Sequence, residues 1–391
     1  MIRTYKVMLV ANNKQQTKMF QSAGAARFAY NWALAYESEN HKSGNKFISD
    51  CDLRRIFTRL KKTEEYAWLN DYSNDATKQA IKDACVAYLN FFKGNSGFPK
   101  FKSKKHSRSS FFVDPVKIQI TETRVKLEKI ANSRRSNRQK LNWIRLAEHN
   151  RIPVNVKYYN PRVTFDGLHW WLSVGVDESE SDDVPSNSGI GIDLGIKDLA
   201  ICSDGSTYKN IHKSCKMKKL AKKKRRLQRK VSKKYHINKK GGSYKKTRSI
   251  AKSEKKLLKV SRKLTNIHHD HMLQAISEII SRKPKFIVIE DLNVKGMVKN
   301  HHLAKAVQDQ TFYEFRRILI YKCEWNNIQL IIANRFFPSS KTCSCCGSIN
   351  HGLKLKDRTF ICPTCGFEID RDFQAAINLA KYGEQQISNI A

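Results

Sequence analysis

The sequence predicts a multidomain α/β protein, and three observations support this prediction. The chain has 391 residues, which exceeds the roughly 250–300 residues at which a single hydrophobic core stops growing. Hydrophobic residues make up 40% of it, which is enough to build packed cores and excludes a disordered or collagen-like chain. The apolar residues follow a helical spacing in some segments and a strand spacing in others.

The first part of the chain predicts a strand followed by helices. Residues 1–10 alternate as in a short strand, with Ile2, Tyr5, Val7 and Leu9 available for burial. Apolar residues then recur at helical spacing in 15–37 and again in 76–92. We therefore expect residues 11–95 to form a small helical domain.

Strand signals return after a break at Gly94–Pro99. The short β-type runs are 116–120, 154–158 and 170–176. They predict a β-barrel that comprises residues 1–10 and 96–180, so that the helical domain is an insertion between its strands. An acidic stretch that passes into Pro, Ser and Gly residues makes 181–188 the expected linker.

The second half alternates strands and helices. Strand signals at 190–194 and 199–202 precede a basic helical region, 209–263, which a glycine-containing break at 239–243 divides into two helices. The later elements are expected to be a helix near 272–280, a strand at 286–289, a helix at 311–325, a strand at 328–333 and a final helix at 373–380. This order is typical of an α/β layer.

The charge of the chain indicates a polyanionic partner. Lys and Arg number 74 and Asp and Glu 35, which leaves a net charge of +39. Region 209–263 alone contains 25 Lys and Arg and one acid, Glu254. A charge run is often only a solvated face, but this density favours nucleic acid. The candidate contacts are Lys222, Lys223, Lys224, Arg225, Arg226, Arg229, Lys230, Lys245, Lys246 and Arg248.

A membrane partner is not expected, because no apolar run approaches the about 18 residues of a membrane span. We therefore expect the protein in the cytosol.

Four cysteines have the spacing of a zinc ribbon. Cys343 and Cys346 form one C-x2-C pair, and Cys362 and Cys365 form a second pair after fifteen intervening residues. Two such pairs supply the four thiolates of a tetrahedral structural zinc site, which leaves no open position for catalysis. The fifth cysteine, Cys345, is expected to be a spectator, with exchange for Cys346 as the alternative.

Three acidic residues are candidates for a functional site because of their positions in the predicted strands and helices. Asp193 interrupts one apolar strand, Glu290 ends another, and Asp372 precedes the final helix. Each has a simple alternative explanation, which for Asp372 is an ordinary helix N-cap. Together they could converge on a pair of Mg²⁺ ions that activate water and stabilise the leaving oxygen in phosphodiester cleavage.

Several segments resemble the TnpB family, whose members are encoded by insertion sequences, were long called transposases, and are related to type V CRISPR effectors. The segments are GIGIDLGIKDLAICSDG (189–205), FIVIEDLNVKGM (286–297), FPSSKTCSCCG (337–347) and DRDFQAAINLA (370–380). The resemblance implies an RNase H-like RuvC nuclease domain at 189–339 and 369–391, interrupted by a zinc ribbon at 340–368. It also implies that the N-terminal barrel is a wedge domain and the inserted helices a recognition domain.

The resemblance implies an RNA-guided DNA endonuclease with two catalytic Mg²⁺ ions and one structural Zn²⁺ ion. A guide RNA from the transposon end would pair with one DNA strand, and the protein would read a short flanking motif in the duplex. The catalytic residues carry over to Asp193, Glu290 and Asp372, with Asp370 and Asp291 as nearby alternatives. Asp291 is expected to point to the opposite side of the strand from Glu290. Gln374 stands where the family usually has Asn.

Other function classes remain open at this point. A DNA transposase would bind transposon ends without RNA, a non-cleaving RNA-guided repressor would bind its target without cutting, and a generic zinc-ribbon RNA-binding protein would show no cleavage that depends on Mg²⁺. The protein partner, if any, is not indicated by the sequence.

Overall fold

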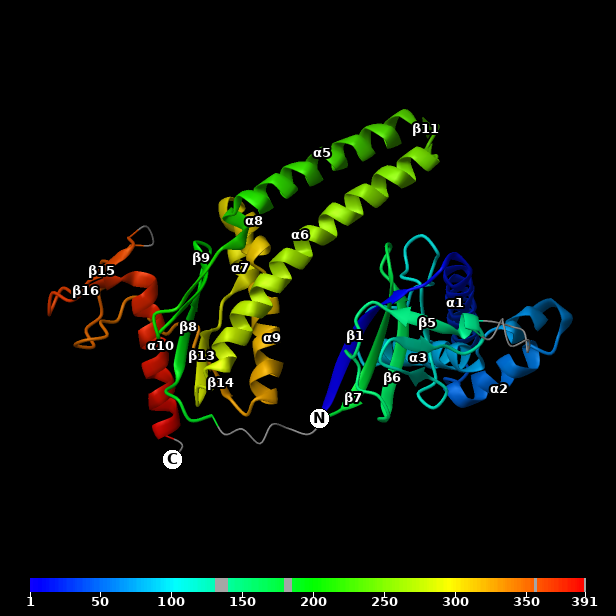
Figure 1. Cartoon of the computed structure of the whole chain (residues 1–391), viewed down its shortest axis with the longest axis horizontal. Helices are drawn as coiled ribbons and strands as arrows, with labels where there is room; N and C mark the ends of the chain where they lie inside the picture. The colour runs from blue at the N-terminus through cyan, green and yellow to red at the C-terminus, as the bar shows by residue number, and fades with distance from the viewer. Residues whose placement is uncertain (131–139, 179–184, 355–356, 390–391) are drawn as a thin grey trace. The chain divides into compact units, whose positions relative to one another are not determined.

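The computed structural model describes residues 1–130, 140–178, 185–354 and 357–389. The chain divides into two compact units, Met1–Ser179 and Glu180–Ala391, whose elements are shown in Figure 1. Within the described ranges, no helix combines the length and the apolar composition that crossing a membrane requires.

The first unit is built on a seven-stranded sheet with the order β2-β6-β7-β1-β5-β4-β3. Strand β1, Ile2–Val10, lies in the middle and pairs antiparallel with β7 along its length, as predicted for a strand near the N-terminus. The other strands are β2 (Ser110–Phe112), β3 (Gln119–Ile120), β4 (Arg124–Lys126), β5 (Trp143–Leu146), β6 (Tyr158–Phe165) and β7 (Trp170–Asp177). The β-rich character of this part is confirmed, and closure into a barrel stays a prediction.

Two of the expected strands are wrong over most of their length. Residues 116–118 belong to a turn, because Asp114 accepts hydrogen bonds from the amide of Val116 through its side chain (2.7 Å) and from the amide of Ile118 through its carbonyl (3.0 Å). The run 154–158 is irregular until Tyr158, since Asn155 has a left-handed backbone with φ of 59°. Both errors come from local turns that interrupt β-type composition.

Helices follow β1 and precede β2 in the chain. They are α1 (Asn13–Lys42), α2 (Asp50–Leu60), a 3-10 helix, η1 (Glu64–Asp71), and α3 (Asn74–Phe92). The two predicted helices are confirmed as parts of α1 and α3, whereas α2 was not predicted. A capping box of Asn12 and Gln15 starts α1. Its small buried residues pack against α3, and the helices share one hydrophobic core with the sheet.

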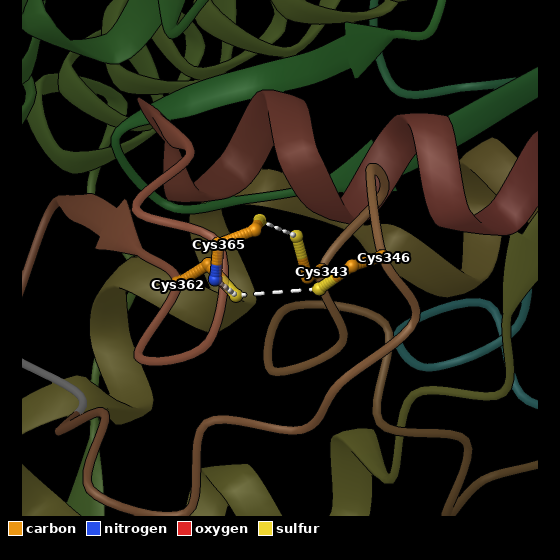
Figure 2. A group of neighbouring side chains, drawn as sticks. All are labelled: Cys343, Cys346, Cys362 and Cys365. Atoms are coloured by element: carbon orange, nitrogen blue, oxygen red, sulfur yellow. Dashed lines mark hydrogen bonds between the residues drawn. The ribbon is translucent and has the colours of Figure 1, made fainter.

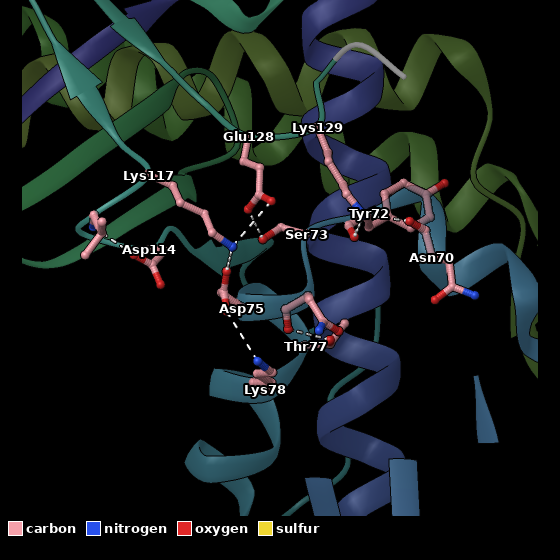
Figure 3. Close-up of polar contacts among 12 residues, drawn as sticks. Asn70, Tyr72, Ser73, Asp75, Thr77, Lys78, Asp114, Lys117, Glu128 and Lys129 are labelled. Carbon is pink, nitrogen blue, oxygen red and sulfur yellow. Dashed lines mark hydrogen bonds and ion pairs between the residues drawn. The ribbon is translucent and has the colours of Figure 1, made fainter. Parts of the chain in front are cut away.

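Polar contacts also fix the start of α3 to the loops of this sheet (Figure 3). Lys117 pairs with Asp75 of α3 and lies 3.6 Å from Glu128, whose other oxygen accepts a hydrogen bond of 2.7 Å from Ser73. Lys129 donates to the carbonyls just before α3, at 2.8 Å to Asn70 and 3.2 Å to Tyr72. The helix start is therefore held by charge as well as by packing.

The second unit contains a five-stranded sheet with the order β10-β9-β8-β13-β14. Strand β13 is parallel to both of its neighbours, β8 and β14. The bounds are β8 (Ile190–Leu194), β9 (Asp198–Cys202), β10 (Thr207–Lys209), β13 (Phe286–Glu290) and β14 (Gln329–Ala333). The strands predicted around 190, 199, 286 and 328 are confirmed.

Helices cover the two faces of this sheet (Figure 1). Ile287 and Ile289 of β13 share a core with α6 (Arg248–Ser281) and α9 (Phe312–Trp325), whereas Phe286 and Val288 share one with α10 (Arg371–Ser388). This division follows from the alternation of side chains along a strand. The predicted helices at 311–325 and 373–380 are confirmed as α9 and part of α10.

The basic region consists of two helices, as predicted. Helix α5 (Cys215–Ile237) and α6 pack together and are joined by a short hairpin of β11 (Lys239–Lys240) and β12 (Ser243–Tyr244). The separate helix expected near 272–280 is wrong, because α6 continues without a break to Ser281. Its basic outer half and apolar inner half look unlike in composition, yet they form one helix whose inner half enters the core of the sheet.

The remaining elements are short. They are η2 (Lys140–Asn142), η3 (Ile211–Lys213), α7 (Val294–Lys299), α8 (His301–Gln310), β15 (Thr359–Ile361) and β16 (Glu368–Asp370).

Candidate carboxylate and metal sites

Asp193 and Glu290 lie on adjacent parallel strands and on the same face of the sheet. Ile192 of β8 pairs with Ile289 of β13, so the two acids that follow them are neighbours at the carboxyl ends of the strands. Ile192 and Ile289 both face the core with α6 and α9, which directs Asp193 and Glu290 to the face that α10 covers. Asp372 belongs to the first turn of α10.

The pKa of Asp193 reports how close these acids are. Burial raises it well above its usual value, and the negative charges of Glu290, Asp372 and, to a smaller extent, Asp370 raise it further, with Arg371 opposing them in part. A carboxyl group held in this way favours a nearby cation, because a cation removes the repulsion and restores the charged form. Carboxylate oxygens are the ligands that Mg²⁺ takes in proteins, which makes these acids the candidate metal ligands.

Neighbouring side chains orient the other two acids. The buried Ser339 hydroxyl donates a hydrogen bond to Glu290 Oε1. Asp372 Oδ1 accepts a hydrogen bond of 2.9 Å from Arg371 Nη2, and its Oδ2 lies 3.6 Å from Arg358 Nη1. Ser339 was missed by sequence reasoning, although it stands in the FPSSK segment that carried part of the family resemblance.

The two alternative acids have structural partners. Asp370 is the N-cap of α10, since its Oδ1 accepts hydrogen bonds from the amides of Asp372 (3.0 Å) and Phe373 (3.1 Å). The N-cap explanation offered for Asp372 is therefore wrong. Asp291 is held by Arg316 of α9, at 2.9 Å, and by Arg335, and these hydrogen bonds lower its pKa. Arg316 belongs to the helix on the far face, which agrees with the expected direction of Asp291.

Gln374 has a clear structural task. Its fully buried side chain donates a hydrogen bond of 2.6 Å to the carbonyl of Thr342 and accepts one of 2.9 Å from Ser344 Oγ. One turn later, Asn378 Nδ2 donates to the carbonyls of Ser339 and Thr342, both at 2.6 Å. These amides fix the segment that enters the cysteine cluster to α10, and that same segment supplies the hydroxyl group on Glu290.

The four predicted cysteines come together (Figure 2). The sulfur atoms of Cys343, Cys346, Cys362 and Cys365 all lie within 4.8 Å of one another, with Sγ distances of 3.7 Å between Cys343 and Cys365 and 3.5 Å between Cys346 and Cys362. A tetrahedral site with metal–sulfur bonds of about 2.3 Å places its sulfurs about 3.8 Å apart. The donor set thus fits one tetrahedral metal ion, and Cys345 is not part of it.

The local backbone explains why the sequence folds into this cluster. Each pair is closed by a turn in which a glycine with positive φ, Gly347 (77°) or Gly366 (72°), donates to the carbonyl of the first cysteine. Hydrogen bonds from Ser348 Oγ and the amide of Cys365 lower the pKa of Cys362 to about 5. A lowered pKa favours the thiolate, which is the form that binds metal.

The predicted basic contacts lie on α5, on the loop that follows β12 (Lys245 and Lys246) and at the start of α6 (Arg248). Helix α5 has twelve Lys and Arg and no acid in its 23 residues. Its more buried positions are three or four residues apart and face α6: they are Met217, Leu220, Lys224, Leu227 and Val231. Most of the predicted set is exposed, and Lys224 is half-buried. Lys246 differs, since it pairs with Glu254 at 2.5 Å.

Three family models match parts of the chain. They are described as "Probable transposase" over residues 172–301, "Cas12f1-like, TNB domain" over 312–379, and "Helix-turn-helix domain" over 1–46. The last range holds a strand and one long helix in this structure.

Curated relatives match nearly the whole chain. A protein of Escherichia coli K12 named "Putative RNA-guided DNA endonuclease InsQ" is 29% identical over 98% of this chain and 92% of its own length. A protein of Streptomyces pristinaespiralis named "Putative RNA-guided DNA endonuclease" is also 29% identical, over 97% of this chain and 89% of its own.

Among solved structures, a Cas12f1 chain in a cryo-EM complex with single-guide RNA and target DNA has a TM-score of 0.61 at 14% identity, and the match covers 97% of this chain and 98% of that one. This similarity extends the agreement to the fold. The matching family models and the full-length relatives, together with this similarity of fold, support membership of the chain in the TnpB family.

Proposed function

We propose that the chain is an RNA-guided DNA endonuclease that cleaves DNA by two-metal-ion hydrolysis of a phosphodiester bond. The observation that carries the proposal is that the charges of Glu290 on β13 and Asp372 on α10 raise the pKa of Asp193 on β8. The names of the full-length relatives support the guided activity.

Each acid has a distinct proposed role. Asp193 would contribute to both ions, with Glu290 and Asp372 completing the coordination. Ser339 would keep one oxygen of Glu290 occupied and its carboxylate plane fixed, and Arg371 would hold Asp372 in the same way. Two Mg²⁺ ions, when bound, supply activation of water and stabilisation of the leaving oxygen.

The cysteine cluster is proposed to hold one structural Zn²⁺. The tetrahedral spacing of four sulfurs supports this ion, and all four donors being protein thiolates leaves no open position for chemistry. Zinc would stabilise the segment 340–368, whose own core consists of few residues.

The partners follow from the proposed activity. A guide RNA from the transposon end would pair with one strand of a DNA duplex that carries a short flanking motif, because in such systems base pairing reads the sequence. The basic surface of α5 and the hairpin would contact phosphates of the nucleic acid. We assign the wedge domain to residues 1–10 and 96–180, the recognition domain to 11–95 and the RuvC domain to 189–339 and 369–391. We propose the cytoplasm as the location of the protein.

A cleavage assay on a randomised-flank plasmid library tests the proposal. The protein is purified after co-expression with the DNA that flanks its gene and is assayed with Mg²⁺, beside Asp193→Ala and a control at an exposed acid of α6, Asp270→Ala. We expect guided cutting next to one enriched motif, which is lost in Asp193→Ala and kept in the control.

Other outcomes of that assay would overturn the proposal. Target binding without cutting by the unchanged protein would favour a guided repressor. Binding only to transposon ends, without RNA, would favour the transposase that the family description names.

A further inference from the structure

Two aromatic side chains stand out from the protein surface. Phe336 is 88% exposed and Tyr313 is 72% exposed, which makes them the most exposed aromatic residues in the described ranges. Single exposed apolar residues are common and need no explanation by themselves. These two are distinguished by where the chain places them.

Both aromatic residues adjoin the arginines that hold Asp291, the neighbour of Glu290. Phe336 follows Arg335, which binds the Asp291 side chain and lies 3.4 Å from its carbonyl. Tyr313 precedes Arg316 by three residues on α9, so the two share a helix face, and Arg316 binds Asp291 at 2.9 Å. Arg335 and Ser339 flank the turn that carries Phe336 and bind Asp291 and Glu290, so this turn lies beside the carboxylate site. Tyr313 belongs to α9, which packs on the opposite face of the sheet.

The turn that carries Phe336 is fixed on both sides. Asn334 accepts a hydrogen bond of 3.0 Å from the amide of Phe336 through its side chain and one of 3.0 Å from the amide of Phe337 through its carbonyl. The ring of Phe337 packs inward on Tyr382 at 4.8 Å, and Ser339 bonds to Glu290. Phe336 is therefore an outward-facing ring on a rigid turn rather than the end of a loose loop.

We propose that Phe336 stacks on a base of the single DNA strand as it enters the carboxylate site. This rests on the proposed function, since a nuclease must bring a strand to these acids. Stacking on an aromatic ring tolerates any base, which suits an enzyme whose sequence choice is made by a guide. The two arginines share one carboxylate, so a positive charge remains for the adjacent phosphate.

Fluorescence of single-stranded DNA tests the stacking without cleavage. An oligonucleotide with 2-aminopurine is titrated into Asp193→Ala protein, with and without Phe336→Ala, Phe336→Trp and the apolar control Phe336→Leu. We expect quenching that Phe336→Trp retains and that Phe336→Ala and Phe336→Leu lose, with affinity falling roughly 5- to 100-fold. Equal quenching by all four proteins would overturn the proposal.

Guided cleavage separates this proposal from the proposed function. In the active protein, Phe336→Leu should slow single-turnover cutting by a similar factor, leave guided target binding and Tm unchanged, and be rescued by Phe336→Trp. Cutting by Phe336→Leu at the normal rate would overturn the stacking role while the nuclease stands. If quenching depends on Phe336 but the active protein never cuts DNA, the stacking role is supported and the proposed nuclease activity is refuted.

Discussion

Replacing Gly191 by Ala should disturb the carboxylate site without touching any acid. Gly191 lies in β8, two residues before Asp193 and on the face that α10 covers. A Cβ atom there would lie 2.1 Å from the carbonyl oxygen of Ala376 and 2.5 Å from the amide nitrogen of Ala380. Both are backbone atoms of α10, so the helix itself must move by about 1 Å to relieve the overlap.

The expected cost has two parts. Overpacking of this kind destabilises by about 3 kcal/mol, and for the 212 residues of Glu180–Ala391 that lowers Tm by roughly 6–12 °C. Because Asp372 belongs to α10, a displacement of this helix by about 1 Å should also slow cleavage by around 100-fold.

The assays are thermal unfolding and single-turnover DNA cleavage, with RNA binding as the measure of the rest of the molecule. Gly24→Ala is the matched control, since its added Cβ meets nothing within 4 Å in helix α1, and it should raise stability by about 0.5–1 kcal/mol. Normal Tm and normal cutting in Gly191→Ala would refute the close packing of α10 on β8.

Three further predictions concern charge and metal. The folded-state pKa of Asp193 is raised, so ionisation of this carboxyl lowers the stability of the protein as the pH rises above about 3.8. Without metal, D193N should therefore have a higher Tm than the unchanged protein at pH 8, and this difference should shrink toward pH 4. Mg²⁺ should raise the Tm of the unchanged protein only. A chromogenic chelator should release one zinc per chain from the unchanged protein and from C345S, and none from C343S. Arg226→Ala should lower the slope of log Kd against log salt for RNA by about one, whereas Lys246→Ala should change it less because Glu254 already pairs with that lysine; equal slopes in the two variants would contradict this.

Features that depend on short sequence spacings could be predicted from the sequence. The cysteine spacing predicted the cluster, because two C-x2-C turns with following glycines specify their own geometry. Apolar runs predicted the strands that carry Asp193 and Glu290, since buried parallel strands are continuous in hydrophobicity. The density of Lys and Arg likewise predicted the two basic helices.

Errors arose where composition and local turns disagreed. The turn at Asp114 and the left-handed Asn155 removed strand structure from β-type sequence. The apolar stretch near Met272 appeared as a separate helix, although it is the buried half of α6. In both cases the structure depends on a local backbone conformation or on a packing partner, and neither can be predicted from the type of one residue alone.

The sequence by itself determined which residues can bind metal and nucleic acid, because ligand chemistry belongs to individual side chains and to short spacings. Only the tertiary structure put Asp193 and Glu290 side by side on adjacent parallel strands and gave Asp370 and Asp291 hydrogen-bond partners of their own. It alone brought Ser339 to Glu290 and Arg335 to Asp291, on either side of the turn that carries Phe336. The physical reason is that these contacts join segments distant in the chain, whose meeting depends on packing of the whole unit.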